Sequence, residues 1–128
     1  MELTIEEALR RGIEAHQSGR LEEADRYYTA ILQADPRHAD ANHNLGVLAA
    51  GLGQMDLAIE SFHAALVIDP ERSDVYNNLG IAYKNRGELD EAMDCYRKAL
   101  LIKPDYADAH NNRGNVHKQK GNFDEAIR

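Results

Sequence analysis

The chain has 128 residues, of which 15 are basic and 22 acidic, so its net charge is −7 with neutral histidines. Such a balance provides no basic stripe to displace counterions from phosphates, and we expect no nucleic-acid partner. A single cysteine excludes an internal disulfide, the acidic N-terminus is unlike a signal peptide, and no apolar run is long enough to span a bilayer. The sequence therefore predicts a soluble, cytoplasmic globular protein with no membrane partner.

Prolines and small residues recur along the chain every 34 residues. Four series keep this spacing: Pro36, Pro70 and Pro104; Gly12, Gly46, Gly80 and Gly114; Gly19, Gly53, Gly87 and Gly121; and Ala24, Ala58, Ala92 and Ala126. Several series with one shared period indicate internal duplication. We predict one domain of three complete units and part of a fourth, at approximately 5–38, 39–72, 73–106 and 107–128.

Each unit is predicted to be a helical hairpin, because apolar residues recur within it at helical spacing. The first helix begins at Thr4-Ile5-Glu6-Glu7, which fits a capping box. The chain then reverses at Gly19, since glycine readily adopts the positive φ of such a turn, and the second helix stops before Pro36. The later units repeat this order. In the last unit we expect a reversal at Gly121, so that the second helix has only begun by Arg128.

The glycine series that begins at Gly12 falls inside the predicted first helices. Glycine costs about 1 kcal/mol there relative to alanine, so its recurrence implies a close approach of the paired helix. We expect the alanine series of the second helices to be its partner. The fourth member, Gly114, is included in this expectation.

These residues resemble the pattern of the tetratricopeptide-repeat family, whose 34-residue unit is a helix–turn–helix. Unit three carries the whole pattern, in Tyr76, Leu79-Gly80, Tyr83, Gly87, Ala92, Tyr96, Ala99 and Pro104. Other units depart from it where bulky residues are usual, at Arg11 and Ile31, at Asn42 and Ala49, and at Arg113 and His117.

The resemblance implies an all-α, right-handed α-solenoid in which first helices line a concave groove. One hairpin cannot bury its own apolar face, so neighbouring units complete its core. Since no capping helix follows the fourth unit, we expect this chain to be a fragment of a longer protein. Its open end would also allow self-association into a homo-oligomer.

The resemblance further implies which residues line the groove of a protein- or peptide-binding scaffold. They are Arg10, His43, Asn44, Asn77, Asn78, Ile81, Lys84, Asn111, Asn112, Asn115 and Lys118, and His16 and Asp74 are expected to line the groove as well. Asn44, Asn78 and Asn112 form a ladder at the repeat spacing, similar to that of the O-linked N-acetylglucosamine transferase family. An amide both donates and accepts, which suits bonding to an extended peptide backbone. The alternative is that duplication copied a tolerated, solvated asparagine.

A second subgroup of the family clamps C-terminal carboxylates with a lysine early in the first helix. The corresponding positions here hold Leu9, His43, Asn77 and Asn111, which argues against that specificity.

The sequence contains no motif of catalysis, and we predict neither enzymatic activity nor a cofactor or metal. Neither a phosphate-binding loop nor a nucleophile elbow nor a His-Glu-x-x-His motif is present. His110 and His117 are expected in the core or at the open end. Cys95 has Asp94 beside it, which disfavours a thiolate. We therefore predict an interaction scaffold; the alternatives are the substrate-recognition part of a glycosyltransferase or sulfotransferase, and a self-assembling repeat module.

Overall fold

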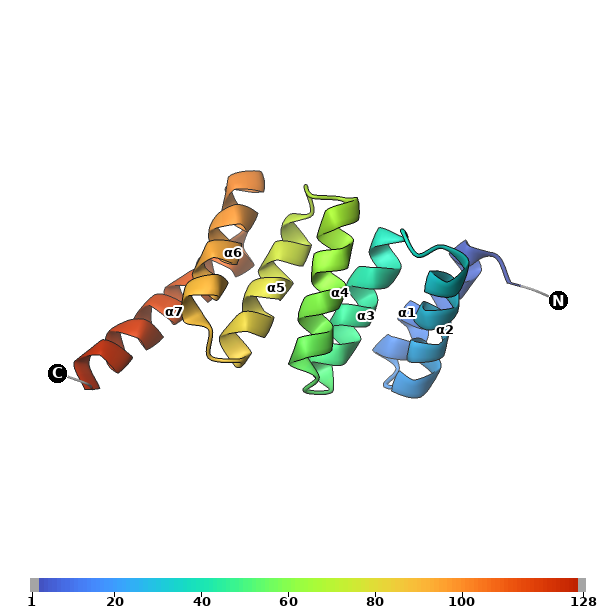
Figure 1. Ribbon diagram of the computed structural model, residues 1–128, viewed down its shortest axis with the longest axis horizontal. Helices are drawn as coiled ribbons and strands as arrows, with labels where there is room; N and C mark the ends of the chain where they lie inside the picture. The colour runs from blue at the N-terminus through green and yellow to red at the C-terminus, as the bar shows by residue number, and fades with distance from the viewer. Residues whose placement is uncertain (1–2, 127–128) are drawn as a thin grey trace. The chain divides into compact units, whose positions relative to one another are not determined.

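A computed structural model describes the backbone of residues 3–126 and the side chains of residues 3–122. Within this part of the chain every regular element is a helix (Figure 1). The helices are α1 (Ile5–Gln17), α2 (Leu21–Ala34), α3 (Ala39–Gly51), α4 (Met55–Ile68), α5 (Ser73–Asn85), α6 (Leu89–Ile102) and α7 (Ala107–Ala126). The predicted all-α repeat fold is confirmed. The chain divides into two compact units, residues 1–70 with α1–α4 and residues 71–128 with α5–α7.

Each hairpin turns at a glycine in the left-handed region. The φ angles of Gly19, Gly53 and Gly87 are 79°, 78° and 84°. At the first turn the Arg20 amide donates to the Ala15 carbonyl at 2.8 Å and the Gly19 amide donates to the His16 carbonyl at 3.1 Å. These two bonds form a Schellman motif, which satisfies carbonyls left open at the end of a helix. The turn predicted from glycine spacing is confirmed at these three positions.

The second helices end where the prolines follow. The Asp35 amide still bonds the Ile31 carbonyl at 2.7 Å, after which Pro36 has no N–H to continue the ladder. In two of the repeats a side chain six residues later bonds the proline carbonyl. Asn42 Nδ2 donates to the Pro36 oxygen at 3.2 Å, and His110 Nε2 lies 2.8 Å from the Pro104 oxygen. The connection between repeats is therefore fixed by a side chain of the following helix.

The glycines inside the first helices lie against aromatic rings of the second helices. A Cβ built on Gly12 would lie 2.7 Å from Tyr28 Cε1, and one on Gly80 would lie 2.5 Å from Tyr96 Cε1. Gly46 faces Phe62 at 2.6 Å in the same way. The expected close approach exists, but the alanine series is not the partner that requires it. The flat ring occupies the space that a side chain at the glycine would need.

The alanines serve the cores of the units instead. Ala24, Ala58 and Ala92 are fully buried. In the first unit Ala24 packs in a cluster with Ala15, Tyr28 and Leu48. A second cluster in the other unit joins Ala92 and Tyr96 of α6 to Val116 of α7. Small side chains at these positions let neighbouring helices lie close together.

The fourth repeat departs from the prediction, because α7 continues through Gly121 to Ala126. Gly121 adopts no positive φ, and a Cβ on Gly114 would meet nothing within 4 Å. The reversal at Gly121 and the packing reason for Gly114 were therefore both wrong. A reversal loses backbone hydrogen bonds of the helix, and this cost is offset only when a second helix packs against the first. Within the described residues no second helix packs against α7, so a continued helix is favoured.

Candidate functional site

An amide–amide hydrogen bond joins α5 to α7 in the second unit. Asn112 Nδ2 donates to Asn77 Oδ1 at 3.0 Å, and Asn77 is only 4% exposed. Because Asn77 is buried, its oxygen depends on this donor, and the bond fixes the two helices side by side. One rung of the predicted asparagine ladder thus has a structural task. We name the surface around this bond the amide face.

The amide face also includes other polar and apolar residues of the two helices that the bond joins. On α5, Asn78, Ile81 and Lys84 are half-buried, and Ile81 also packs on the cluster of Ala92, Tyr96 and Val116. On α7, Asn111, Asn115 and Lys118 are exposed. Residues three and four apart lie on one side of a helix, so each helix presents amides followed by a lysine. The structure places these predicted residues together in one unit.

The predicted residues of the first unit differ more in their surroundings. Arg10 is exposed on α1, and Asn44 is half-buried on α3. His43 is 9% exposed, and its ring centroid lies 5.8 Å from that of Phe62. His16 Nδ1 lies 3.4 Å from the Tyr28 hydroxyl. Both histidine rings therefore contact the aromatic residue of their own repeat's second helix.

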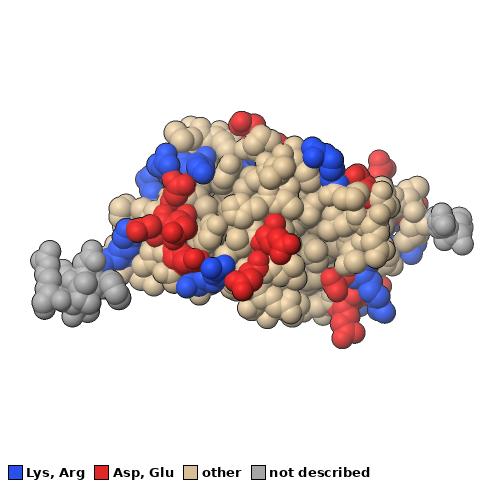
Figure 2. All heavy atoms as spheres, in the orientation of Figure 1, with Lys and Arg blue, Asp and Glu red and all other residues tan. Residues whose placement is uncertain are grey.

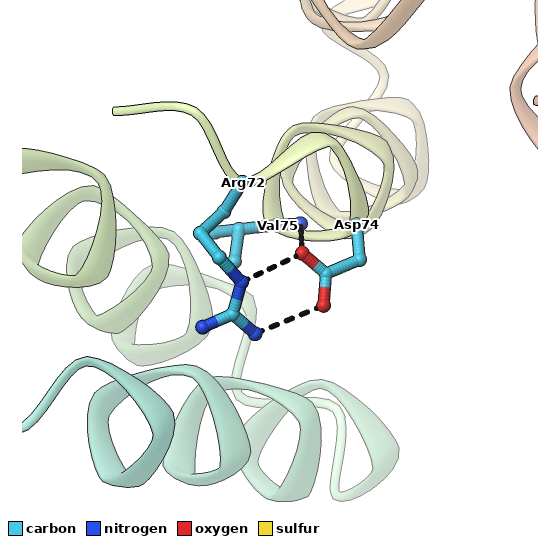
Figure 3. Close-up of polar contacts among 3 residues, drawn as sticks. All are labelled: Arg72, Asp74 and Val75. Carbon is cyan, nitrogen blue, oxygen red and sulfur yellow. Dashed lines mark hydrogen bonds and ion pairs between the residues drawn. The ribbon is translucent and has the colours of Figure 1, made fainter. Parts of the chain in front are cut away.

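The start of α5 holds an ion pair that fixes Asp74 (Figure 3). Arg72 approaches it with two nitrogens, Nε at 3.0 Å from Oδ1 and Nη2 at 2.9 Å from Oδ2. The Val75 amide also donates to Oδ1, at 2.9 Å. A carboxylate in the first turn is favoured by the helix dipole as well. Asp74 was expected to line the groove, and in the structure its carboxylate bonds Arg72 and the Val75 amide at the beginning of α5.

Tyr106 belongs to the same polar region, although no motif in the sequence predicts this. Burial raises the pKa of its hydroxyl, the Asp74 and Asp108 carboxylates raise it further, and a hydrogen bond with Asn77 opposes them. Its ring also lies 4.9 Å from Lys103 Nζ. Asn77 is consequently bonded by two partners from the region that begins α7. Tyr106 lies in the connection between α6 and α7, where no periodic pattern marks it, so its hydrogen bond with Asn77 is found only in the structure.

Charges of both signs are present on the surface. Figure 2 shows Asp and Glu as well as Lys and Arg among the residues coloured on the face in view. On α6, Asp94 pairs with Arg97 and with Lys98, and its pKa is lowered mainly by the hydrogen bond from Arg97. Exposed pairs of this kind add little stability.

The cysteine and the two histidines considered above as catalytic or metal-binding candidates lie in surroundings that do not favour either role. Cys95 is 6% exposed, and burial raises the pKa of its thiol to about 12. His110 and His117 are exposed, so neither lies in the core. Among the described residues no three His, Cys, Asp or Glu side chains are grouped as metal ligands would be. None of the described helices has the length and apolar character of a membrane span.

Comparison with family models gives matches over most of the chain. Residues 9–73 match a model described as tetratricopeptide repeat, residues 62–94 match a second model of that description, and residues 82–121 match one described as TPR repeat. Among curated proteins, no sequence matches this chain significantly.

Solved structures with the same fold include proteins of several kinds. MamA has a TM-score of 0.87 at 27% identity, over 97% of this chain and 72% of that one. The first TPR of Spaghetti, bound to the HSP90 peptide SRMEEVD, has a TM-score of 0.88 at 20% identity, over 91% and 93%. A mutant O-GlcNAc transferase of Thermobaculum terrenum has a TM-score of 0.84 at 28% identity, over 91% of this chain but 23% of that one.

Proposed function

The chain belongs to the tetratricopeptide-repeat family, and from this premise we propose that it holds a segment of a partner protein against its first helices. The repeat fold is that of a non-catalytic interaction scaffold. The proposal adds a binding surface in each unit, taken separately: Arg10, His43 and Asn44 in the first unit, and the amide face of α5 and α7 in the second.

The observation that carries the proposal is the bond between Asn77 and Asn112. It joins two asparagine-bearing helices, which also carry Asn78 on α5 and Asn111 and Asn115 on α7. Side-chain amides can bond both the N–H and the C=O of an extended backbone, whatever its sequence. A face fixed before binding loses little entropy when a peptide arrives. The ligand class that fits is an extended polypeptide, with weak sequence preference.

The lysines of the amide face favour a ligand with negative charge. Lys118 lies about one helical turn beyond Asn115, and Lys84 lies nearly two turns beyond Asn78. Acidic side chains of a bound peptide would pair with them and speed its association, an effect that salt reduces. We therefore expect acidic segments to bind better than basic ones, and less tightly at high ionic strength.

This specificity differs from that of a carboxylate clamp. The clamp requires lysine where this chain has Leu9, His43, Asn77 and Asn111, and here Asn77 is buried. The Spaghetti domain binds the peptide SRMEEVD. Our proposal predicts that this chain binds that peptide no better than a variant with an amidated C-terminus.

The test uses a phage-displayed library of random 12-residue peptides, followed by calorimetric titration of the selected sequences. Asn78 and Asn115 are changed together to alanine, since neither makes the bond that joins the helices. We expect a loss of affinity of about tenfold or more, which corresponds to about 1.4 kcal/mol. The control is Gln33→Ala, an exposed change on α2. An empty selection, or equal binding by the double variant, would refute the proposed surface.

A second candidate function is substrate presentation within a larger enzyme. It is favoured by the 28% identity to the O-GlcNAc transferase, of which this chain spans 23%. Under that proposal the amide face would bind the protein substrate and a separate domain would perform the chemistry. The molecular mass of the native protein, measured with an antibody to this chain, separates the two: the enzyme candidate requires a much larger species.

A further inference from the structure

The first turn of α3 is capped by a histidine side chain. His38 precedes the helix with φ of −82° and ψ of 106°, and its Nδ1 accepts the Ala41 amide at 3.0 Å. The first turn of a helix leaves its N–H groups without carbonyl partners, and a capping side chain supplies one of the missing acceptors. A backbone N–H can only donate, so Nδ1 must offer a lone pair. The ring is therefore neutral, with its proton on Nε2.

The first helices of the neighbouring repeats begin with other acceptors. At the corresponding position of α1, the Thr4 hydroxyl accepts the Glu7 amide at 3.1 Å. At the start of α5, the Arg72 side chain makes no cap, and Asp74 Oδ1 accepts the Val75 amide at 2.9 Å. A hydroxyl keeps its lone pairs at all ordinary pH values, and a carboxylate stays charged above about pH 5. Of these three helices, only α3 depends on an acceptor that can take up a proton near neutral pH.

The capped turn belongs to the connection between the first two repeats. The His38 carbonyl accepts the Asn42 amide at 3.1 Å and Asn42 Nδ2 at 3.0 Å. Asn42 is buried, and so is Ala41, which packs with Ala8 of α1 and Ile31 of α2 in one core cluster. The turn that His38 caps is therefore the part of α3 through which the second repeat contacts the first.

The charged groups near His38 do not replace the bond to Ala41. Asp35, at the end of α2, accepts the His38 amide through its carbonyl at 3.2 Å and the Arg37 amide through Oδ1 at 3.1 Å. Asp40, in the first turn of α3, is exposed. Among the described residues no side chain of α1, α2, α3 or α4 forms an ion pair with the His38 ring. The two aspartates attract a charged ring only weakly through solvent, while Arg37 and the positive end of the helix dipole repel it.

We propose that His38 is an acid-sensitive cap, which holds the first turn of α3 at neutral pH and releases it when the ring takes up a proton from solvent. A proton on Nδ1 occupies the lone pair that the Ala41 amide needs, so the proton and the hydrogen bond exclude each other. The protonated ring is also a cation at the positive end of the helix, which is unfavourable. Acidification therefore removes the acceptor of a half-buried N–H and weakens the connection between the first two repeats.

The first test is NMR of the unaltered chain, labelled with ¹⁵N. At pH 7.5 we expect the His38 ring to carry its proton on Nε2 alone. As the pH is lowered to 5.5, the Ala41 amide resonance should shift together with the ring resonances of His38. The Glu7 amide, which bonds the Thr4 hydroxyl, should stay in place and is the internal control. A proton on Nδ1 at pH 7.5 overturns the proposal, as does an Ala41 amide that does not follow the ring.

The second test compares the stability of the unaltered chain with that of His38→Asn. Asparagine is a good capping residue and does not titrate, while the other histidines are the same in both proteins. Urea unfolding is measured at pH 7.5 and at pH 5.5. Relative to the variant, the folded-to-unfolded ratio of the unaltered chain should fall by about fivefold to tenfold at the lower pH. His117→Asn, an exposed change on α7, is the control and should keep the pH dependence of the unaltered chain. The same pH dependence in His38→Asn as in the unaltered chain overturns the proposal.

Discussion

Replacing the equivalent glycines of α5 and α7 by alanine should change stability in opposite directions. Gly80→Ala places a Cβ 2.5 Å from Tyr96 Cε1 and 2.9 Å from Cδ1, about 1 Å closer than ordinary contact. Tyr96 is fully buried, so its ring has no free space into which to move. Overpacking of this kind costs about 1–3 kcal/mol, and we expect the upper part of that range. Gly114→Ala meets no neighbour.

The pair isolates packing because both changes gain the same helix propensity, about 1 kcal/mol. Gly114→Ala should therefore raise the free energy of unfolding by about that amount. Gly80→Ala should lower it by about 1–2 kcal/mol, so the two variants differ by the overpacking cost alone. Urea unfolding followed by circular dichroism at 222 nm measures both, with equal slopes as evidence that the same surface unfolds. If the Gly80→Ala protein were as stable as the Gly114→Ala protein, the close packing of the Tyr96 ring against Gly80 would be refuted.

Three further outcomes follow from single contacts. Asn112→Ala should lower the free energy of unfolding, measured by thermal unfolding, by about 1–3 kcal/mol, because it leaves the buried oxygen of Asn77 unpaired. Asn111→Ala, at an exposed position, should change it little, and equal effects of the two variants would contradict the structural role of the bond. Tyr96→Phe should raise the free energy of unfolding by about 1 kcal/mol, since the buried hydroxyl has no partner within the described residues, and a loss of stability in urea would be the contrary result. At pH 8 iodoacetamide should label Cys95 at least about a hundredfold more slowly in the native chain than in urea, because the reacting thiolate is scarce when the pKa of the thiol is about 12. Labelling of the native chain at the unfolded rate would show that the thiol is exposed.

The hairpins were predictable from sequence because each depends on a residue with a local conformational effect. Gly87 permits the positive φ of its turn, and Pro104 removes the N–H that would continue the preceding helix. Both effects act on the backbone of one or two residues, so spacing alone reveals them. The reversal at Gly121 was wrong because a turn also needs a second helix that packs back. That condition is tertiary, and a glycine does not report it.

The candidate site was predictable only as a set of positions. The family resemblance selected Asn77 and Asn78 together, but the structure buries the first and leaves the second half-buried. Adjacent residues on a helix point about 100° apart, and only the packing of α7 decides which of them it covers. The contribution of Tyr106 was missed for a related reason. Its hydrogen bond with Asn77 joins a connecting segment to a helix, and no periodic pattern marks such a contact.

Because an aromatic ring packs directly against each glycine, we expect substitutions at these two positions, sixteen residues apart, to depend on each other. Tyr28, Phe62 and Tyr96 show that the ring tolerates loss of its hydroxyl, while the glycine opposite it is the same in all three repeats. Because the ring fills the space beside the glycine, we expect a mutation that enlarges the glycine to be tolerated only together with one that shrinks the ring.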